Sequence, residues 1–249
     1  MLDLAPSKII AVHLSYRSRA AERGRIPAQP SYFLKAPSTL SGHDAPVHRP
    51  RGCELLAFEG EIALVIGSVA RDVPPGKAWE HVRWVTAGND FGLYDLRYAD
   101  PGSNVHSKGL DGFTPVGPEL LAAADVDPGD LQLQTWVNGR RVQHARTDDL
   151  LFSFDLIIAD LSRVMTLCEG DIIMTGTPTG SSVVVPGDVV EVEVDAGPGL
   201  RTGRLRNRVT ESDHELGPWG AKPTITADTL SAAFGTEPVP ERFAGPAGT

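Results

Sequence analysis

Two glutamates, Glu59 and Glu61, are separated by a single residue inside an apolar run that extends over residues 54–67. The run predicts a long β-strand, which a kink could interrupt, and alternate residues of a strand face the same side. The two Cα atoms would then lie about 6.6 Å apart. Two carboxylates inside an apolar strand repel each other and lose hydration, so a bound divalent cation is the simplest compensation. The alternative is an exposed edge strand with two solvated glutamates.

Asp90 is the natural third ligand. Residues 84–90 predict a strand that delivers Asp90 at its end, although an Asn-Asp pair also suits a turn or a helix cap. An all-oxygen ligand set favours Mg²⁺, Mn²⁺ or Ca²⁺ over Zn²⁺, and three carboxylates leave about half of an octahedral shell for water or substrate. A lysine ammonium filling the gap between these carboxylates would remove the support for a metal.

Lys108 is the candidate cation inside the site. It lies in a long irregular stretch, residues 91–117, of the kind that is either functional or disordered in a compact domain. We expect His106, in the same stretch, to form hydrogen bonds rather than take part in catalysis. Arg97 and Asp111 are further candidates for contact with a substrate.

Residues 16–24 predict a short helix that Gly24 ends. Arg19 and Glu22 are three residues apart and therefore share a helical face, which at a surface would be a weak ion pair. Arg19 is a candidate partner for an anionic substrate, and Arg17 in the same segment is the second candidate.

Other segments supply the framework that must position these residues. Residues 170–180 predict a strand followed by a turn in which Gly176 and Thr177 could present donors to an anion. Asn138-Gly139 predicts a hairpin. Strands are expected over 8–15 and 31–35, within 131–142 on both sides of the Asn138-Gly139 turn, and as a β-ribbon over 186–194 and 202–209. Helices are expected over 77–83 and 148–165, and a surface loop over 36–51. A polar tail begins at residue 211, and we expect its end, from about residue 237, to be mobile or to pack on a neighbour.

The composition is that of a globular protein. The chain has 249 residues, of which 41% are hydrophobic and 22% charged, with a formal net charge of −9. The negative charge argues against nucleic acid as a partner. No run approaches the ~20 apolar residues that span a bilayer, and the N-terminus lacks the features of a signal peptide, so we expect no membrane association and a cytoplasmic location. Cys53 and Cys168 match no metal or redox spacing.

Four motifs occur in order: Glu59-Gly-Glu61, Asn89-Asp90, Lys108-Gly-Leu-Asp111-Gly-Phe-Thr-Pro, and Gly-Asp-Ile-Ile-Met-Thr-Gly-Thr-Pro-Thr-Gly over 170–180. With these motifs the chain resembles the fumarylacetoacetate hydrolase family from about residue 8 to about residue 209. The resemblance implies a mainly β fold with some α-helix, the mixed β-sandwich roll of that family. We expect an N-terminal strand and lid segment over 1–50, a catalytic β-roll domain over 51–220 and a C-terminal tail over 221–249.

The resemblance also implies site roles. It implies a homodimer and a divalent metal, Mg²⁺ with Mn²⁺ or Ca²⁺ as alternatives, held by Glu59, Glu61 and Asp90. It implies a site lysine at Lys108 and a Thr-Gly-Thr turn that holds the substrate carboxylate. Residues 32–42 are similar to the bacterial branch that processes 2-oxo dicarboxylates in aromatic (homoprotocatechuate) catabolism, which includes an isomerase and a decarboxylase.

One departure from the family pattern bears on the reaction. Hydrolytic members, and several decarboxylating ones, carry Tyr-x-x-His-x-x-Glu in the lid, whereas this chain has Tyr16-Arg-Ser-Arg19-Ala-Ala-Glu22. A guanidinium is a poor general base but a good bidentate partner for a carboxylate. The change disfavours hydrolysis and makes Arg19, or Arg17, the candidate partner of a remote carboxylate.

The expected function is isomerisation or decarboxylation of a 2-oxo or 2-hydroxydienoic dicarboxylate through a metal-stabilised enolate. Lys108 either donates to the enolate oxygen or, with a depressed pKa, moves the proton, and Glu22 is the second acid/base. The first alternative is a C–C hydrolase for acylpyruvates or fumarylacetoacetate-like diketones. The second is a relative that binds a metal or an oxo acid without catalysis.

Overall fold

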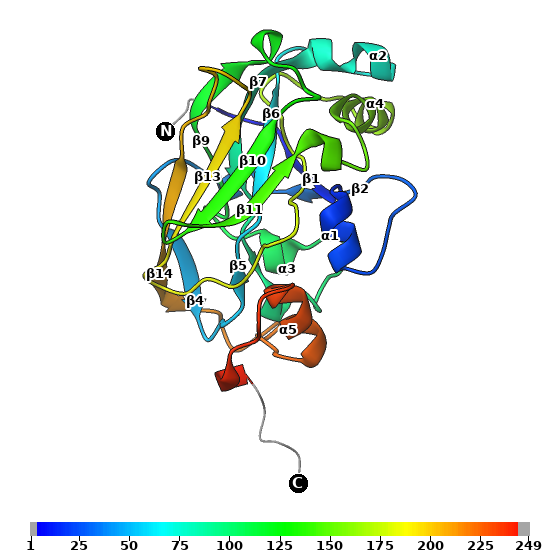
Figure 1. Cartoon of the computed structure of the whole chain (residues 1–249). Coiled ribbons are helices and arrows are strands. Elements are labelled where there is room, and N and C mark those ends of the chain that lie inside the picture. Colours follow the sequence, from blue (N-terminus) through cyan, green and yellow to red (C-terminus); the bar gives the residue numbers. More distant parts are fainter. Residues whose placement is uncertain (1–3, 244–249) are drawn as a thin grey trace.

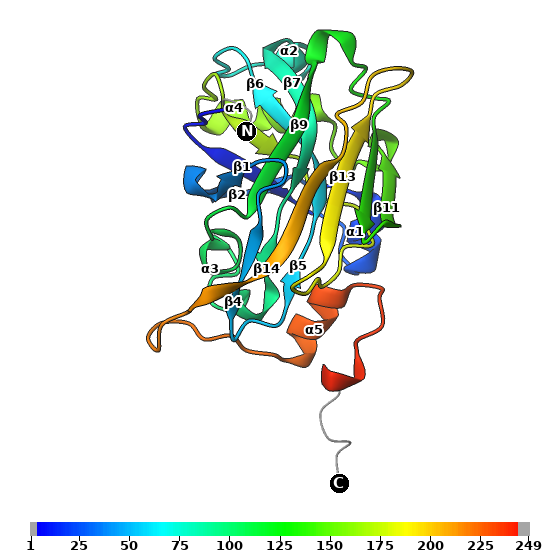
Figure 2. The same cartoon turned by 90° about the vertical axis from the view of Figure 1, so that its left-hand side faces the viewer.

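The computed structural model describes residues 4–243, which fold as two large β-sheets packed face to face (Figures 1 and 2). One sheet has seven strands in the order β2-β1-β12-β6-β7-β9-β3, the other has five in the order β11-β10-β13-β14-β4, and β5 pairs with β8. The strands are β1 (Ile9–His13), β2 (Ser31–Lys35), β3 (Leu40–Ser41), β4 (Val47–Arg51), β5 (Leu56–Ala57), β6 (Gly60–Ile66), β7 (Val82–Asn89), β8 (Gly92–Leu93), β9 (Thr114–Ala122), β10 (Gln132–Val137), β11 (Arg140–Arg146), β12 (Ile172–Met174), β13 (Val189–Asp195) and β14 (Leu205–Glu215).

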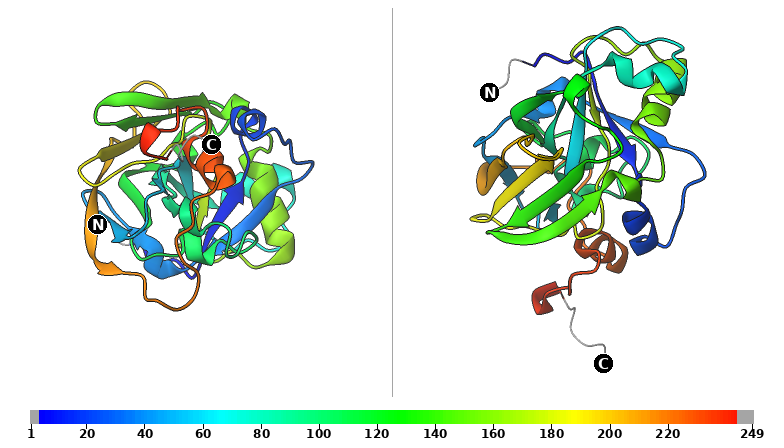
Figure 3. Two further views of the ribbon diagram at one scale, coloured as in Figure 1. Left: turned by 90° about the horizontal axis from the view of Figure 1, so that it is seen from below. Right: turned by 45° about the horizontal axis from the view of Figure 1, so that its top comes forward.

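Helices cover the edges and one end of the sheets (Figure 3). They are α1 (Arg17–Glu22), α2 (Pro75–Ala78), α3 (Val105–Lys108), α4 (Phe154–Val164) and α5 (Ala227–Phe234), with short 3₁₀ turns between several elements. The expected mixed sandwich roll, mainly β with α, is confirmed. Strands from residues 1–50 join sheets built by residues 51–220, so the expected boundary at residue 50 does not separate two packing units.

The pairing of β6 with β7 brings the acidic residues together. The predicted strand over 54–67 is interrupted between β5 and β6, and Glu59 lies at this kink. Gly60 pairs with Asn89, whose side chain accepts a hydrogen bond from the Glu59 N–H at 2.9 Å. The Asp90 N–H in turn donates to the Glu59 carbonyl at 2.9 Å. The end of β7 is therefore fixed beside the start of β6.

The main core lies between the two sheets and α4. Ile62 and Leu64 of β6 pack with Leu133 of β10, and α4 buries Ile157 and Ile158 against them. The predicted helix over 148–165 begins at Phe154 instead, because a 3₁₀ turn occupies Thr147–Asp149 and the Ser153 side chain caps the helix by accepting from the Leu156 N–H at 3.3 Å.

The hairpin prediction is confirmed, since Asn138 and Gly139 have φ values of +50° and +79° and join β10 to β11. The loop expected over 36–51 is instead shaped into β3, β4 and a 3₁₀ turn, and the helix expected over 77–83 is divided into α2 and a 3₁₀ turn. Both cysteines are free. No helix within residues 4–243 has the length and apolar character needed to cross a bilayer.

The C-terminal segment differs most from the sequence prediction of a polar tail. It contains α5, which starts with a capping box between Thr226 and Thr229. Its Ala233 and Phe234 are buried against Leu55 and against Ala57 of β5, and Phe243 packs on Phe234 with ring centroids 5.7 Å apart. The prediction was wrong for residues 227–243 because the apolar side chains of α5 are few and their partners lie far away in sequence. Residues 244–249 lie outside the described part of the chain.

Candidate active site

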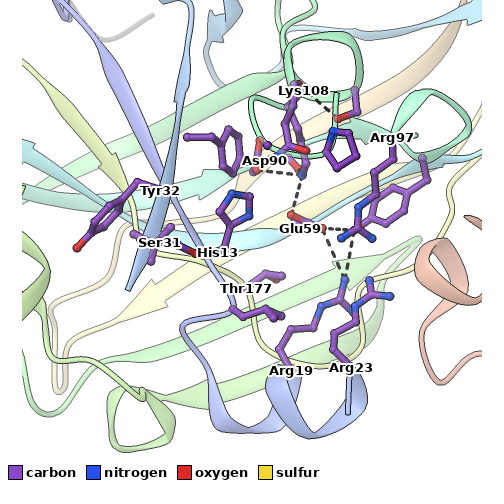
Figure 4. A pocket seen from close by; sticks show the side chains of 18 of the residues that line it. His13, Arg19, Arg23, Ser31, Tyr32, Glu59, Asp90, Arg97, Lys108 and Thr177 are labelled. Atoms are coloured by element: carbon purple, nitrogen blue, oxygen red, sulfur yellow. Dashed lines mark hydrogen bonds and ion pairs between the residues drawn. The ribbon is translucent and has the colours of Figure 1, made fainter. Parts of the chain in front are cut away.

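A cavity of about 640 Å³ opens beside the acidic cluster (Figure 4). Its wall is formed by β1 and β2, by α1 and the residues that follow it, by Glu59 and Glu61, and by the segment from Asp90 to α3. Segments far apart in sequence therefore contribute to one site. The two carboxylates and the aspartate that the sequence analysis singled out all line this cavity.

Glu59, Glu61 and Asp90 form the candidate metal centre. Each offers a carboxylate oxygen, and these three oxygens lie within 4.8 Å of one another. Glu61 and Asp90 are both 2% exposed. The donor set consists of carboxylate oxygens alone, which suits a hard divalent cation, and the grouping agrees with the sequence prediction.

Two lysines compensate part of this charge. Lys108 Nζ lies 2.6 Å from Glu59 Oε2, 2.9 Å from Asp90 Oδ2 and 2.6 Å from the Asp90 carbonyl oxygen. Lys35, which is fully buried, donates to the other oxygen of Asp90. The Lys108 ammonium therefore lies in the gap between Glu59 and Asp90, an arrangement that we expected to argue against a metal, but among the described residues it forms no ion pair with Glu61.

Glu61 is left without a cation. Its carboxylate accepts a hydrogen bond from the Gly176 N–H at 2.7 Å, and it forms no ion pair with any residue between 4 and 243. Burial raises the pKa of Glu61 well above its usual range, and the charges of Asp90 and Glu59 raise it further. One uncompensated buried carboxylate thus remains beside two others, and a divalent cation fits this arrangement.

The same network sets the charge of Lys108. Burial lowers the pKa of this lysine, but Asp90 and Glu59 outweigh burial and hold the pKa above its usual range. Burial also raises the pKa of Glu59, yet Lys108, Arg19 and a hydrogen bond from Tyr94 bring it down to about 2. Lys108 is therefore an ammonium, and the expectation that a depressed pKa would let it carry the proton is not supported.

Arg19 and Glu22 lie at the edge of the site. Arg19 is 3% exposed; it pairs with Glu22, lies 3.6 Å from Glu59 Oε1 and donates to Ser181 at 2.9 Å. Glu22 also accepts from the Thr179 hydroxyl at 3.2 Å and from the Thr236 N–H at 3.1 Å. Both Glu22 oxygens are thus engaged, and Glu22 does not line the cavity.

Of the other predicted residues, some line the cavity and some do not. Arg97 and Thr177 line the cavity, and Gly176 contacts Glu61 through its N–H. Arg17 points away and donates to the carbonyl groups of Asp148 and Leu150. Asp111 is exposed and lies outside the cavity wall.

His106 is also outside the cavity wall and lies 3.4 Å from Asp100, which agrees with the expectation that it forms hydrogen bonds.

Sequence reasoning missed four residues of the site: Lys35, His13, Tyr94 and Arg23. His13 ends β1, packs on Phe33 with ring centroids 4.7 Å apart, and has a pKa lowered mainly by burial. The available signal was the position of His13 and Lys35 at the ends of short apolar strands. Recognising it requires the antiparallel register that pairs Ile9 with Lys35.

Comparisons with known proteins agree with this geometry. The family model described as fumarylacetoacetate (FAA) hydrolase C-terminal matches residues 8–210. The chain is 40% identical over 209 residues to the 4-hydroxyphenylacetate degradation bifunctional isomerase/decarboxylase of Salmonella dublin, covering 82% of this chain. It spans 47% of that relative, about half of its length.

Two solved structures extend the comparison. The 2-hydroxyhepta-2,4-diene-1,7-dioate isomerase from Mycobacterium marinum is 36% identical, with a TM-score of 0.75 over 84% of this chain and 77% of the other. The fumarylpyruvate hydrolase from Pseudomonas aeruginosa, solved in complex with Mn²⁺ and pyruvate, is 27% identical, with a TM-score of 0.76 over 84% and 91%.

Proposed function

Because the chain belongs to the fumarylacetoacetate hydrolase family, we propose that it is a divalent-metal-dependent enzyme that isomerises or decarboxylates a 2-oxo or 2-hydroxydienoic dicarboxylate. The proposed activity is of the 2-hydroxyhepta-2,4-diene-1,7-dioate isomerase or 5-oxopent-3-ene-1,2,5-tricarboxylate decarboxylase type. The M. marinum isomerase and the S. dublin isomerase/decarboxylase support this substrate class.

The observation that carries the proposal is the cluster of Glu59, Glu61 and Asp90 beside a cavity, in which Glu61 forms no ion pair with any described residue. A divalent cation held by these three carboxylates would act as a Lewis acid toward the oxygen of a 2-oxo group. Mg²⁺ and Mn²⁺ are the proposed ions, and the Mn²⁺ complex of the P. aeruginosa hydrolase supports this choice.

The residues of the chain supply the rest of the chemistry. Lys108 is a fixed ammonium beside the cluster and stabilises negative charge that develops on the substrate. Glu22 would have to leave Arg19, Thr179 and Thr236 before it could accept a proton. We therefore assign proton transfer to His13, which lines the cavity and whose pKa burial lowers, at C3 or, across a C3=C4 bond, at C5 of the substrate; we assign to Glu22 the role of holding Arg19.

Hydrolysis is less well supported than isomerisation or decarboxylation. Water activation in the lid would need a free base, whereas this lid carries an arginine at position 19 and a glutamate with both oxygens engaged. A guanidinium does not take up a proton at neutral pH. The same site can stabilise an enolate without an activated water, which favours loss of a proton from C3 or C5, or loss of CO₂ from C5, whose electron pair reaches the 2-oxo oxygen through the C3=C4 bond.

Hydrogen exchange at C3 of a 2-oxo dicarboxylate in D₂O tests the proposal. Proton NMR should show rapid loss of the C3 signals with protein plus Mg²⁺ or Mn²⁺, and no loss after exhaustive chelation. His13→Gln should slow the exchange while leaving Mn²⁺ binding intact. Full exchange by metal-free protein would refute the proposed function, and unchanged exchange by the variant would refute the role of His13.

A further inference from the structure

Several arginines at the cavity have no acidic partner. Arg23, Arg25 and Arg97 all line it, and none of the three has a carboxylate within 4.0 Å among residues 4–243. By contrast, Arg19 and Lys108 are paired with glutamates. One part of the cavity wall therefore carries positive charge that the protein itself does not neutralise, which is how a protein receives an anion.

Two of these arginines are organised by one aromatic ring. The guanidinium carbon of Arg97 lies over the Tyr94 ring, 5.4 Å from its centroid, and that of Arg23 lies 6.0 Å from the same centroid. The Tyr94 hydroxyl donates to Glu59. The ring thus reaches from the candidate metal cluster to the two guanidinium groups, which Figure 4 shows converging near Glu59.

We propose that Arg23 and Arg97 form a subsite for the second carboxylate of the substrate, so that this pair selects dicarboxylates over monocarboxylates. The inference rests on the proposed function, which places the 2-oxo acid end of the substrate at Glu59, Glu61 and Asp90. A short carbon chain leaving that end along Tyr94 brings its far carboxylate to the two guanidinium groups.

The other candidates for this role are already engaged. Arg19 pairs with Glu22 and also donates to Ser181, and Arg17 donates to two backbone carbonyl groups. Arg17 does not line the cavity, and the charge of Arg19 is already paired with the Glu22 carboxylate. The assignment therefore moves the far carboxylate from Arg19 or Arg17, where the lid motif alone put it, to Arg23 and Arg97.

Arg23 is held in place by the C-terminal segment. Its guanidinium donates to the Ala232 carbonyl of α5 at 2.5 Å, which leaves its remaining N–H groups for a ligand. Arg97 has no hydrogen-bond or ion-pair partner among the described residues, and it is exposed. Arg97 is the cleaner residue to change, because its replacement removes no contact within the protein other than the one with Tyr94.

The test compares two ligands that differ only at the far end: 2-oxoheptanoate and 2-oxoheptanedioate. Titration calorimetry with Mn²⁺ present would measure the affinity of each for the unmodified protein, for Arg97→Gln, for Arg23→Gln and for the control Arg83→Gln. Arg83 is an exposed arginine on β7, paired with Glu169 outside the cavity.

A hydrogen bond to a charged group contributes enough that losing one arginine should weaken binding of the dicarboxylate by about 10- to 100-fold. We expect Arg97→Gln to show this loss, while its affinity for 2-oxoheptanoate changes by less than about 3-fold. Such a change is smaller than the effect of losing one hydrogen bond to a charged group. Arg23→Gln should behave alike, and Arg83→Gln should leave both affinities unchanged.

The other possible results distinguish failure of the subsite from failure of the proposed function. Unchanged binding of the dicarboxylate by Arg97→Gln and Arg23→Gln would overturn the subsite while leaving the proposed function intact. An equal loss for both ligands would overturn it as well, because that is the signature of a general positive field. If the unmodified protein binds neither 2-oxo acid, both the subsite and the proposed function fail.

Discussion

Gly235 lies where the C-terminal segment contacts Glu22 at the edge of the active site. Its substitution by alanine tests how much this contact contributes to the stability of the protein. Gly235 has φ +58°, and a Cβ at this position would lie 2.5 Å from Glu22 Oε1 and 3.1 Å from its Cδ. The neighbouring Thr236 N–H donates to the same Glu22 oxygen. Gly24→Ala is a matched control, because Gly24 has φ +63° and a Cβ there would meet no atom within 4 Å.

The expected cost has two parts. Placing alanine at a positive φ costs roughly 1–3 kcal/mol, and Gly235 takes the upper part of this range because its ψ of −118° lies outside the left-handed helical region. Gly235→Ala should also displace Glu22 and break its hydrogen bond to Thr236, which adds about 1.5–3 kcal/mol for a bond to a charged group. For a chain of this size the extra term corresponds to a Tm about 3–12 °C lower for Gly235→Ala than for Gly24→Ala.

Thermal unfolding followed by circular dichroism, with urea unfolding as a second measure, would determine the difference. Equal losses of stability in the two variants would refute the reasoning, because they would mean that the contact with Glu22 contributes nothing. A stable Gly235→Ala protein would also show that Glu22 can move away from the C-terminal segment without cost, and Glu22 would then return as a candidate acid/base.

Two further predictions concern charged side chains. Asp171 is buried and accepts from Lys8 Nζ at 2.5 Å and from the Ser7 hydroxyl at 2.7 Å; burial raises its pKa, but these bonds outweigh burial and hold the pKa below its usual range. The carboxylate therefore stabilises the fold above the unfolded-state pKa of about 3.9, and this contribution is lost as the pH falls through the lower folded-state pKa. Asp171→Asn should be less stable at pH 7 by roughly 1.5–3 kcal/mol and should lose less stability than the unmodified protein on acidification, as urea unfolding from pH 7 to pH 3 would show; parallel pH profiles would contradict this. Lys108→Met should lower turnover by about 10²–10³-fold while Mn²⁺ still binds, because Lys108 stabilises charge and the carboxylates hold the ion; loss of Mn²⁺ binding would contradict this division of roles.

The sequence indicated the acidic cluster because its geometry is largely local. Glu61 lies in β6 and Glu59 directly precedes this strand, while Asp90 directly follows β7, the antiparallel neighbour of β6. Alternation along a strand then places the carboxylates together without knowledge of the rest of the fold. The site lysine at position 108 was a candidate because it lies in the irregular stretch over residues 91–117, and the family resemblance implied the same role.

The missed residues depend on contacts between distant segments. Lys35 reaches Asp90 because β2 pairs with β1 at the edge of the sheet that also contains β7, a register that no local pattern specifies. The partners of Glu22 come from residues 179 and 236, the second of which belongs to a segment expected to be a tail. Such contacts depend on how whole helices and strands pack together. The sequence therefore showed the chemical type of each residue but not its position in the folded protein.

The central claim is that Glu59, Glu61 and Asp90 hold one divalent cation although Lys108 already bridges two of them. Calorimetric titration of the metal-free protein with Mn²⁺ tests it most directly, with Glu61→Gln as the variant, because Glu61 forms no ion pair with a lysine or arginine among residues 4–243. The account predicts one Mn²⁺ per chain for the unmodified protein and a loss of at least about 10-fold in affinity for Glu61→Gln. Absence of binding to the unmodified protein, or equal affinity in the variant, would contradict it.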